Sequence, residues 1–162
     1  MLKYDFKPSI LDFFFDKKIR ELCKSCKRYG KKAQCPPYIE SVEYYQNLLP
    51  TYAHGTLILE VFDVSDPYED IGRTSSEFIR KELISIRQSL FLENKHAIVF
   101  GAGSCKICEG DCSFPCRHPE LSLIPIEATG IDVKSMIKYL LKKEIKFPIE
   151  QKFYRIGMIL WD

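Results

Sequence analysis

The chain has 162 residues, of which 46% are hydrophobic and 28% charged, with a net charge of +2. This length suits one domain with a single core, and no apolar run reaches the ~18 residues that a membrane-spanning helix needs. Because the N-terminus is charged from Lys3 onward and has no apolar leader, we expect one cytoplasmic domain over residues 1–162, without a membrane contact.

The first third of the chain favours helices followed by a strand. Ser9 is placed to cap a helix in which apolar residues recur at helical spacing up to Leu22. Residues 39–49 predict a second, short helix, and residues 56–62 have the composition of a strand. Residues 23–37 interrupt this pattern with three cysteines, a glycine and two prolines, and we expect a loop there.

The rest of the chain predicts an alternation of strands and helices. Thr74 and Glu77 match a capping box that opens a long helix. Residues 97–100 form an apolar run typical of a buried strand, and together with the strand at 56–62 they predict two parallel strands joined by a right-handed crossover. Asp132 is placed to cap a further helix, and residues 155–161 predict a closing strand. We therefore expect a small three-layer α/β domain with a mostly parallel sheet, while residues 121–131 are ambiguous between strand and loop.

Seven cysteines fall into two loops of this outline, at residues 23–37 and 101–119. Thiols stay reduced in the cytosol, so clustered cysteines there bind metals or carry redox chemistry more often than they form disulfides. The odd number of cysteines also argues against a complete disulfide framework. Metal ligation is thus the expected role of Cys23, Cys26, Cys35, Cys105, Cys108, Cys112 and Cys116.

Cys105, Cys108, Cys112 and Cys116 supply four thiols within one short segment. A [4Fe–4S] cluster needs four soft thiolates from a tight loop, and the spacing is near the bacterial ferredoxin run. Structural zinc more often takes two separated pairs of ligands. The spacing therefore favours an iron–sulfur cluster, with zinc as the alternative. Gly101 and Gly103 precede the run and are predicted to let the backbone approach this cofactor closely.

Cys23, Cys26 and Cys35 supply only three thiols, so two interpretations stay open. A fourth ligand comes from His54, His118 or a second chain, or else one metal position is open to an exogenous ligand. An open position is typical of a catalytic metal. Two further acidic residues flank the second cysteine loop: Asp132 is most simply a helix cap, and Glu127 is a candidate to orient a ligand or to take a proton.

The segment 17–32 is strongly basic, with eight Lys or Arg residues against the single acid Glu21, a net charge of +7. Such a charge can offset the negative charge of a thiolate-bound cluster. It can also attract RNA, a phosphorylated cofactor or an acidic partner protein. A solvated surface is the ordinary explanation of a charge run, and all these interpretations stay open.

Three stretches together resemble an uncharacterised prokaryotic family called "predicted metal-binding protein" (domain of unknown function 2284). They are Gly101–Cys108, residues 115–119 with residues 126–133, and the first motif from Cys23 to Pro37, so that the resemblance spans nearly the whole chain. All seven cysteines match, whereas Ala33 and Gln34 depart from the aromatic residue expected before Cys35. The resemblance implies metal binding and archaeal or anaerobic bacterial relatives, and it implies no particular reaction.

The leading functional expectation is an iron–sulfur protein with one or two [4Fe–4S] centres that acts in electron transfer or redox chemistry, with a redox partner protein. One alternative is a zinc-binding module that meets RNA or a protein through segment 17–32. Another is a sulfur-transfer or reductive enzyme that uses an open iron at the three-cysteine site. The sequence alone does not decide whether the protein is an enzyme.

Overall fold

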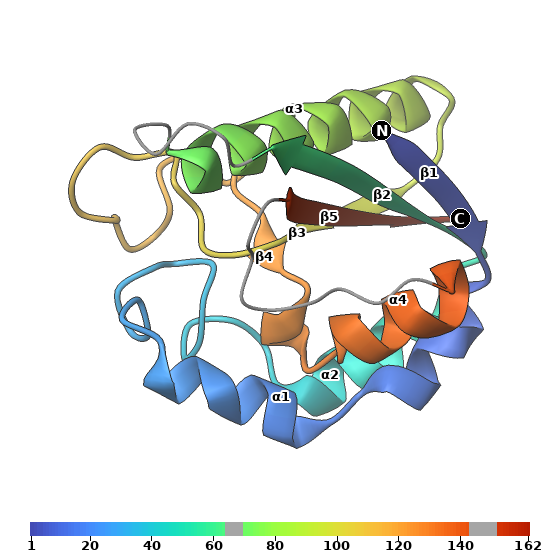
Figure 1. The fold of residues 1–162 in the computed structure, drawn as a ribbon, viewed down its shortest axis with the longest axis horizontal. Coiled ribbons are helices and arrows are strands. Elements are labelled where there is room, and N and C mark those ends of the chain that lie inside the picture. Colours follow the sequence, from blue (N-terminus) through green and yellow to red (C-terminus); the bar gives the residue numbers. More distant parts are fainter. Residues whose placement is uncertain (64–69, 143–151) are drawn as a thin grey trace.

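The computed structural model of the chain describes residues 1–63, 70–142 and 152–162. A five-stranded sheet forms its centre, with strand order β1-β2-β5-β3-β4. Helices lie on both sides of this sheet (Figure 1). The strands are β1 (Leu2–Phe6), β2 (His54–Asp63), β3 (Ala97–Gly101), β4 (Ile124–Pro125) and β5 (Lys152–Trp161).

The sheet is mostly antiparallel, so the prediction of a mostly parallel sheet is wrong. β5 inserts between β2 and β3 and pairs antiparallel with both, and β1 pairs antiparallel with β2. Only the short contact between β3 and β4 is parallel. β2 and β3 do run in the same direction, because each is antiparallel to β5, but they are not neighbours. The sequence pattern predicts strand direction here, whereas neighbours depend on the last strand of the chain.

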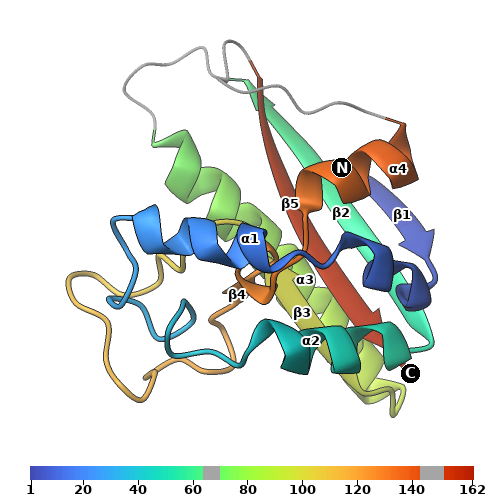
Figure 2. The same ribbon diagram turned by 90° about the horizontal axis from the view of Figure 1, so that it is seen from below.

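The helices divide between the two faces of the sheet. The long helix α3 (Ile71–Leu92) covers one face, and Figures 1 and 2 show α1 (Lys17–Glu21), α2 (Val42–Leu48) and α4 (Val133–Leu141) on the other. Alternation of side chains along each strand produces this division: Ile58 and Ile159 pack with α3, while Leu57 and Met158 pack with the opposite cluster that contains Met136 of α4. No described helix has the length and apolar character to cross a membrane.

Two helices begin at other residues than expected, because an aspartate caps each of them in place of the predicted serine or threonine. α3 begins one turn before the predicted capping box, because the Asp70 carboxylate accepts a hydrogen bond of 3.0 Å from the Arg73 backbone N–H. The helix predicted from Ser9 is also wrong: a 3-10 helix (Pro8–Phe14) lies there, and α1 starts after Asp16, which accepts from the Lys18 N–H at 2.8 Å. The cap by Asp132 is confirmed, since its carboxylate accepts from the Ser135 N–H at 3.0 Å.

The remaining elements are short and complete the chain order. Strand β1 has no counterpart in the sequence prediction, and the ambiguous residues 121–131 contain β4 and a 3-10 helix at Glu127–Thr129. Further 3-10 helices lie at Leu22–Ser25 and Leu49–Thr51. The predicted strands at 56–62, 97–100 and 155–161 are confirmed as parts of β2, β3 and β5.

We expect Gly157→Ala to lower the free energy of unfolding by about 1–3 kcal/mol, the usual cost of overpacking a filled core. A Cβ at Gly157 would lie 2.6 Å from Leu83 Cδ1 and 2.9 Å from Ile79 Cγ2, both on α3. Urea unfolding of the metal-loaded protein measures the change. Lys152→Ala, an exposed change in the same strand, is the control, and equal unfolding midpoints for the two variants would contradict the close packing of α3 on β5.

Candidate metal centre

Both cysteine loops lie at one end of the sheet. The first cysteine loop (residues 23–37) follows α1, and the second cysteine loop (residues 101–119) leaves the carboxyl end of β3. Figures 1 and 2 both show the two loops projecting beyond the sheet on the same side. All seven predicted metal ligands thus gather in one region, although the two groups are about 70 residues apart in the sequence.

Direct contacts join the two loops. The Ala33 backbone N–H donates to Cys112 Sγ at 3.3 Å. The Gln34 side-chain amide donates to Ser122 Oγ at 2.7 Å, and Ser122 Oγ in turn accepts from Cys116 Sγ at 3.5 Å. The rings of Tyr38 and Phe114 lie 4.5 Å apart. Ala33 and Gln34, which directly precede Cys35, therefore hold the first loop against the cysteines of the second.

Two backbone N–H groups already point at cysteine sulfurs. Besides the Ala33 contact with Cys112, the His118 N–H donates to Cys116 Sγ at 3.4 Å. Hydrogen bonds of this kind stabilise the negative charge of a thiolate and tune a metal bound to it. The donors suit sulfurs that carry charge, as metal ligands do.

Cys23, Cys26 and Cys35 line one pocket of about 160 Å³. Gly103 and Ser104 of the second loop form another part of its wall. Among the described residues that line it, Glu127 supplies the only carboxylate. Cys35 is the most buried of the seven cysteines, with 8% of its surface exposed. The pocket thus combines three soft donors with one hard donor, a set able to hold a metal.

Burial favours the protonated form of the Cys23, Cys35 and Cys105 thiols when no metal is bound, because it raises the pKa of each. Burial, together with the neighbouring Cys23, Cys26 and Cys105, raises the pKa of Cys35 to about 11. Burial also raises the pKa of the Cys23 and Cys105 thiols and of the Glu127 carboxyl. A metal that binds here must displace protons, as is usual for thiolate ligands. The influence of Cys105 on Cys35 also places these two thiols, one from each loop, near one another.

The side chains of the described residues do not form a finished coordination shell. No three His, Cys, Asp or Glu side chains within residues 1–63, 70–142 and 152–162 lie at the mutual spacing of metal ligands. Metal sites of this kind are commonly completed only when the metal binds, because binding is coupled to folding of the ligand loops. The chemistry of the donor set fits a thiolate-bound metal or cluster: it offers seven thiols, and the sulfurs of Cys112 and Cys116 accept hydrogen bonds from backbone N–H groups.

The predicted fourth ligands of the three-cysteine group fall in different places. His54 stacks on Trp161, with ring centroids 5.4 Å apart, and Trp161 pairs in register with Ala97 at the start of β3. That is the opposite end of the sheet from the cysteines. His118 belongs to the second loop, next to Cys116. Neither histidine lines the three-cysteine pocket, whereas Glu127 does.

Close neighbours, and at Gly103 also the backbone conformation, disfavour a side chain at Gly101 and Gly103. A Cβ at Gly101 would lie 3.3 Å from Leu123 Cδ1, and Gly103 has a φ of +71°, which favours glycine. A Cβ at Gly103 would also lie 3.0 Å from a terminal nitrogen of Arg155. Their contact with a cofactor stays a prediction.

Part of the basic segment 17–32 is paired within the protein. Lys17 forms an ion pair with Glu43, and Lys24 forms one of 2.6 Å with Glu21. Arg20 donates to the Glu40 backbone oxygen at 2.7 Å. The positive charge of Lys32 lowers the pKa of both Cys35 and Cys105, against the larger effect of their burial. Lys32 thus places at least one positive charge of this segment near the cysteines.

Arg155 is the residue of this region that the sequence prediction missed. It lies in the middle of the closing strand with 8% of its surface exposed, and donates to Ser75 Oγ, the Ala102 oxygen and the Gly72 oxygen, each at 3.0 Å. These bonds tie β5 to the start of α3 and to the residues before Cys105. The available signal in the sequence was a charged residue at the start of the apolar run 155–161.

A family model described as "Predicted metal-binding protein (DUF2284)" matches residues 9–161. No curated protein and no solved structure matches the chain.

Proposed function

We propose that the seven cysteines of this protein bind iron–sulfur centres that act in electron transfer or redox reactions. The chain belongs to the DUF2284 family of predicted metal-binding proteins. Cys105, Cys108, Cys112 and Cys116 would bind one [4Fe–4S] cluster. Cys23, Cys26 and Cys35 would bind a second centre in their shared pocket. A cluster supplies one-electron chemistry when bound, and the protein residues fix its position and charge.

The contact between the two cysteine loops is the observation that carries this proposal. Ala33 and Gln34 of the first loop reach Cys112 and Ser122, so both groups of thiols share one end of the sheet. Two centres side by side suit the passage of electrons from a partner protein through one centre to the other. Lys32, whose charge acts on a cysteine of each loop, would offset the negative charge of the thiolates and raise the reduction potential.

Spectroscopy under anaerobic conditions tests the proposal. The purified protein should be brown, with broad visible absorption that bleaches on reduction with dithionite and a low-temperature EPR signal in the reduced state. A colourless protein that contains stoichiometric zinc would overturn it.

The three-cysteine pocket has the incomplete ligand set from which a reactive centre can be built. Glu127 lines this pocket and is half-buried, so its carboxylate is a candidate fourth ligand. If it remains unbound, one metal position is open to an external ligand, as a sulfur-transfer or reductive enzyme would require. The role of Glu127 therefore separates an electron carrier from an enzyme.

We expect Glu127→Gln to change the EPR spectrum of the three-cysteine centre and to leave the spectrum of the four-cysteine centre unaltered. The amide keeps the shape of the side chain but is a weaker ligand than a carboxylate. Glu109→Gln, an exposed change in the second loop, is the control. Identical spectra for wild type and Glu127→Gln would exclude Glu127 as a ligand and favour the open position.

A zinc-binding module that meets RNA is the second candidate function. Lys27, Arg28 and Lys31 are exposed in the first cysteine loop, and none forms an ion pair with another described residue. Salt-dependent retention on RNA that is lost when these three residues become glutamine would support this function. Retention that does not depend on salt or on these residues would exclude it.

A further inference from the structure

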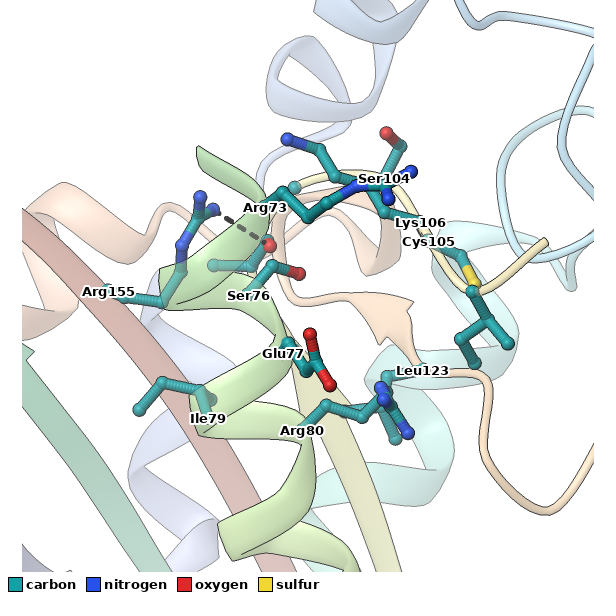
Figure 3. Close-up of a pocket in the computed structure, with 14 residues that line it drawn as sticks. Arg73, Ser76, Glu77, Ile79, Arg80, Ser104, Cys105, Lys106, Leu123 and Arg155 are labelled. Carbon is teal, nitrogen blue, oxygen red and sulfur yellow. Dashed lines mark hydrogen bonds between the residues drawn. The ribbon is translucent and has the colours of Figure 1, made fainter. Parts of the chain in front are cut away.

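We propose that a second pocket, beside the metal centre, binds the phosphate group of a small molecule. It has a volume of about 170 Å³ and lies between the start of α3 and the end of β3. Figure 3 shows Arg73, Ser76, Glu77 and Arg80 of α3 on one side of it, and Ser104, Cys105 and Lys106 of the second cysteine loop on the other. The proposal holds whichever metal the cysteines bind.

The lining of this pocket has an excess of positive charge. Arg73, Arg80, Lys106 and Arg155 line it against one carboxylate, that of Glu77, so the lining carries a net charge of +3. Glu77 also forms an ion pair of 2.9 Å with the exposed Lys81. Among the described residues, no carboxylate lies within ion-pair distance of the four lining cations. This charge suits a dianion better than a carboxylate.

Arg155 is the strongest single feature of the pocket. Its guanidinium is buried, and its three hydrogen bonds go to neutral oxygens of Ser75, Ala102 and Gly72. The charge of the half-buried Glu127 acts on it from beyond ion-pair distance. A buried charge without a close counter-ion is costly, and a bound anion would supply the missing charge.

Two glycines let the charged groups of Lys106 and Arg155 lie close to the backbone beside this pocket. A Cβ at Gly72 would lie 2.9 Å from Lys106 Nζ, and a Cβ at Gly103 would lie 3.0 Å from Arg155 Nη1. Lys106 Nζ therefore lies against the backbone of the first turn of α3. Asp70 caps the same turn through the Arg73 N–H and brings its negative charge close to Lys106.

Ser104 gives a second, independent indication of a ligand. Its side chain is 9% exposed, and its buried hydroxyl has no hydrogen-bond partner among the described residues. A buried hydroxyl without a partner costs stability. Ser104 lines both this pocket and the three-cysteine pocket, so a phosphate held here would place the rest of its molecule beside the metal centre.

Isothermal titration of the anaerobically purified, metal-loaded protein at constant ionic strength tests the proposal. The probes are inorganic phosphate, phenyl phosphate as a monoester, and acetate. We expect saturable binding of one phosphate per chain, and about tenfold weaker binding for Arg73→Gln and for Lys106→Gln, as loss of one charge-assisted hydrogen bond implies. Lys134→Gln, the same charge change on an exposed part of α4, should bind as wild type.

The two phosphate probes also distinguish the source of the group. Tighter binding of phenyl phosphate would assign the pocket to a phosphorylated small molecule, and equal binding would assign it to free phosphate. Absence of saturable binding, acetate binding as tight as phosphate, or equal weakening by Lys134→Gln and Arg73→Gln would each overturn the proposal. Because Arg73 lies on α3 and is not a predicted metal ligand, its variant should keep full metal content, which separates this test from that of the metal centre.

Discussion

Serine in place of Cys35 is expected to remove the metal of the three-cysteine pocket and to leave the centre of the second cysteine loop intact. A serine hydroxyl is a harder, far more basic ligand that replaces a thiolate poorly on iron or zinc. Cys35 is the most buried of the seven cysteines, and Cys23 and Cys26 are the other thiols of its pocket. Metal analysis of the anaerobically purified variant should find the content of one centre in place of two.

The reciprocal variant is the matched control for Cys35→Ser. Cys108→Ser should remove the centre of the second cysteine loop and retain the three-cysteine centre, so the EPR spectra of the two variants should add up to that of the wild type. A Cys35→Ser protein with full metal content in both centres would contradict the assignment of Cys35 as a ligand.

Removal of the metal is expected to expose both cysteine loops to trypsin while the sheet stays folded. The loops contain little regular structure, and metal ligation stabilises such segments by up to about 10–16 kcal/mol in small zinc sites. The residues of the two hydrophobic clusters on the sheet lie outside both cysteine loops. We expect cleavage in the loops to become about a hundredfold faster or more, because a loss of about 3 kcal/mol in local stability suffices for that factor.

Mass spectrometry of the tryptic fragments locates the effect. The expected cuts follow the basic residues of the loops, which are Lys24, Lys27, Arg28, Lys31, Lys32, Lys106 and Arg117. Cuts after Arg80 and Lys81 within α3 serve as the internal control and should stay slow. Equal cleavage of the loops with and without metal would show that the metal does not hold them.

The elements with strong periodicity could be predicted from the sequence, and the order of the strands could not. The apolar run at 97–100 marks β3, and Asp132 marks the start of α4, because burial and capping are local signals. The place of β5 between β2 and β3 depends on packing between segments about 50 and 100 residues apart, and no local pattern reports it. The predicted start of α3 was wrong because Asp70, one turn before the expected cap Thr74, caps the helix instead.

The candidate site divides in the same way. Cysteine spacing alone singled out the seven thiols, because soft ligands from one short loop are a chemical requirement that leaves a sequence pattern. The contacts of Ala33 and Gln34 with the second loop, and the place of Glu127 in the three-cysteine pocket, arise only when the chain folds. The burial of Arg155 likewise depends on its partners Ser75 and Ala102, which lie on other elements.

Determination of iron, acid-labile sulfide and zinc per chain, on protein purified without exposure to oxygen, tests the central claim most directly. Two [4Fe–4S] centres predict about eight iron and eight sulfide per chain with little zinc, and one such centre predicts about half of each. Stoichiometric zinc with neither iron nor sulfide would contradict the iron–sulfur assignment and leave a zinc-binding protein in its place.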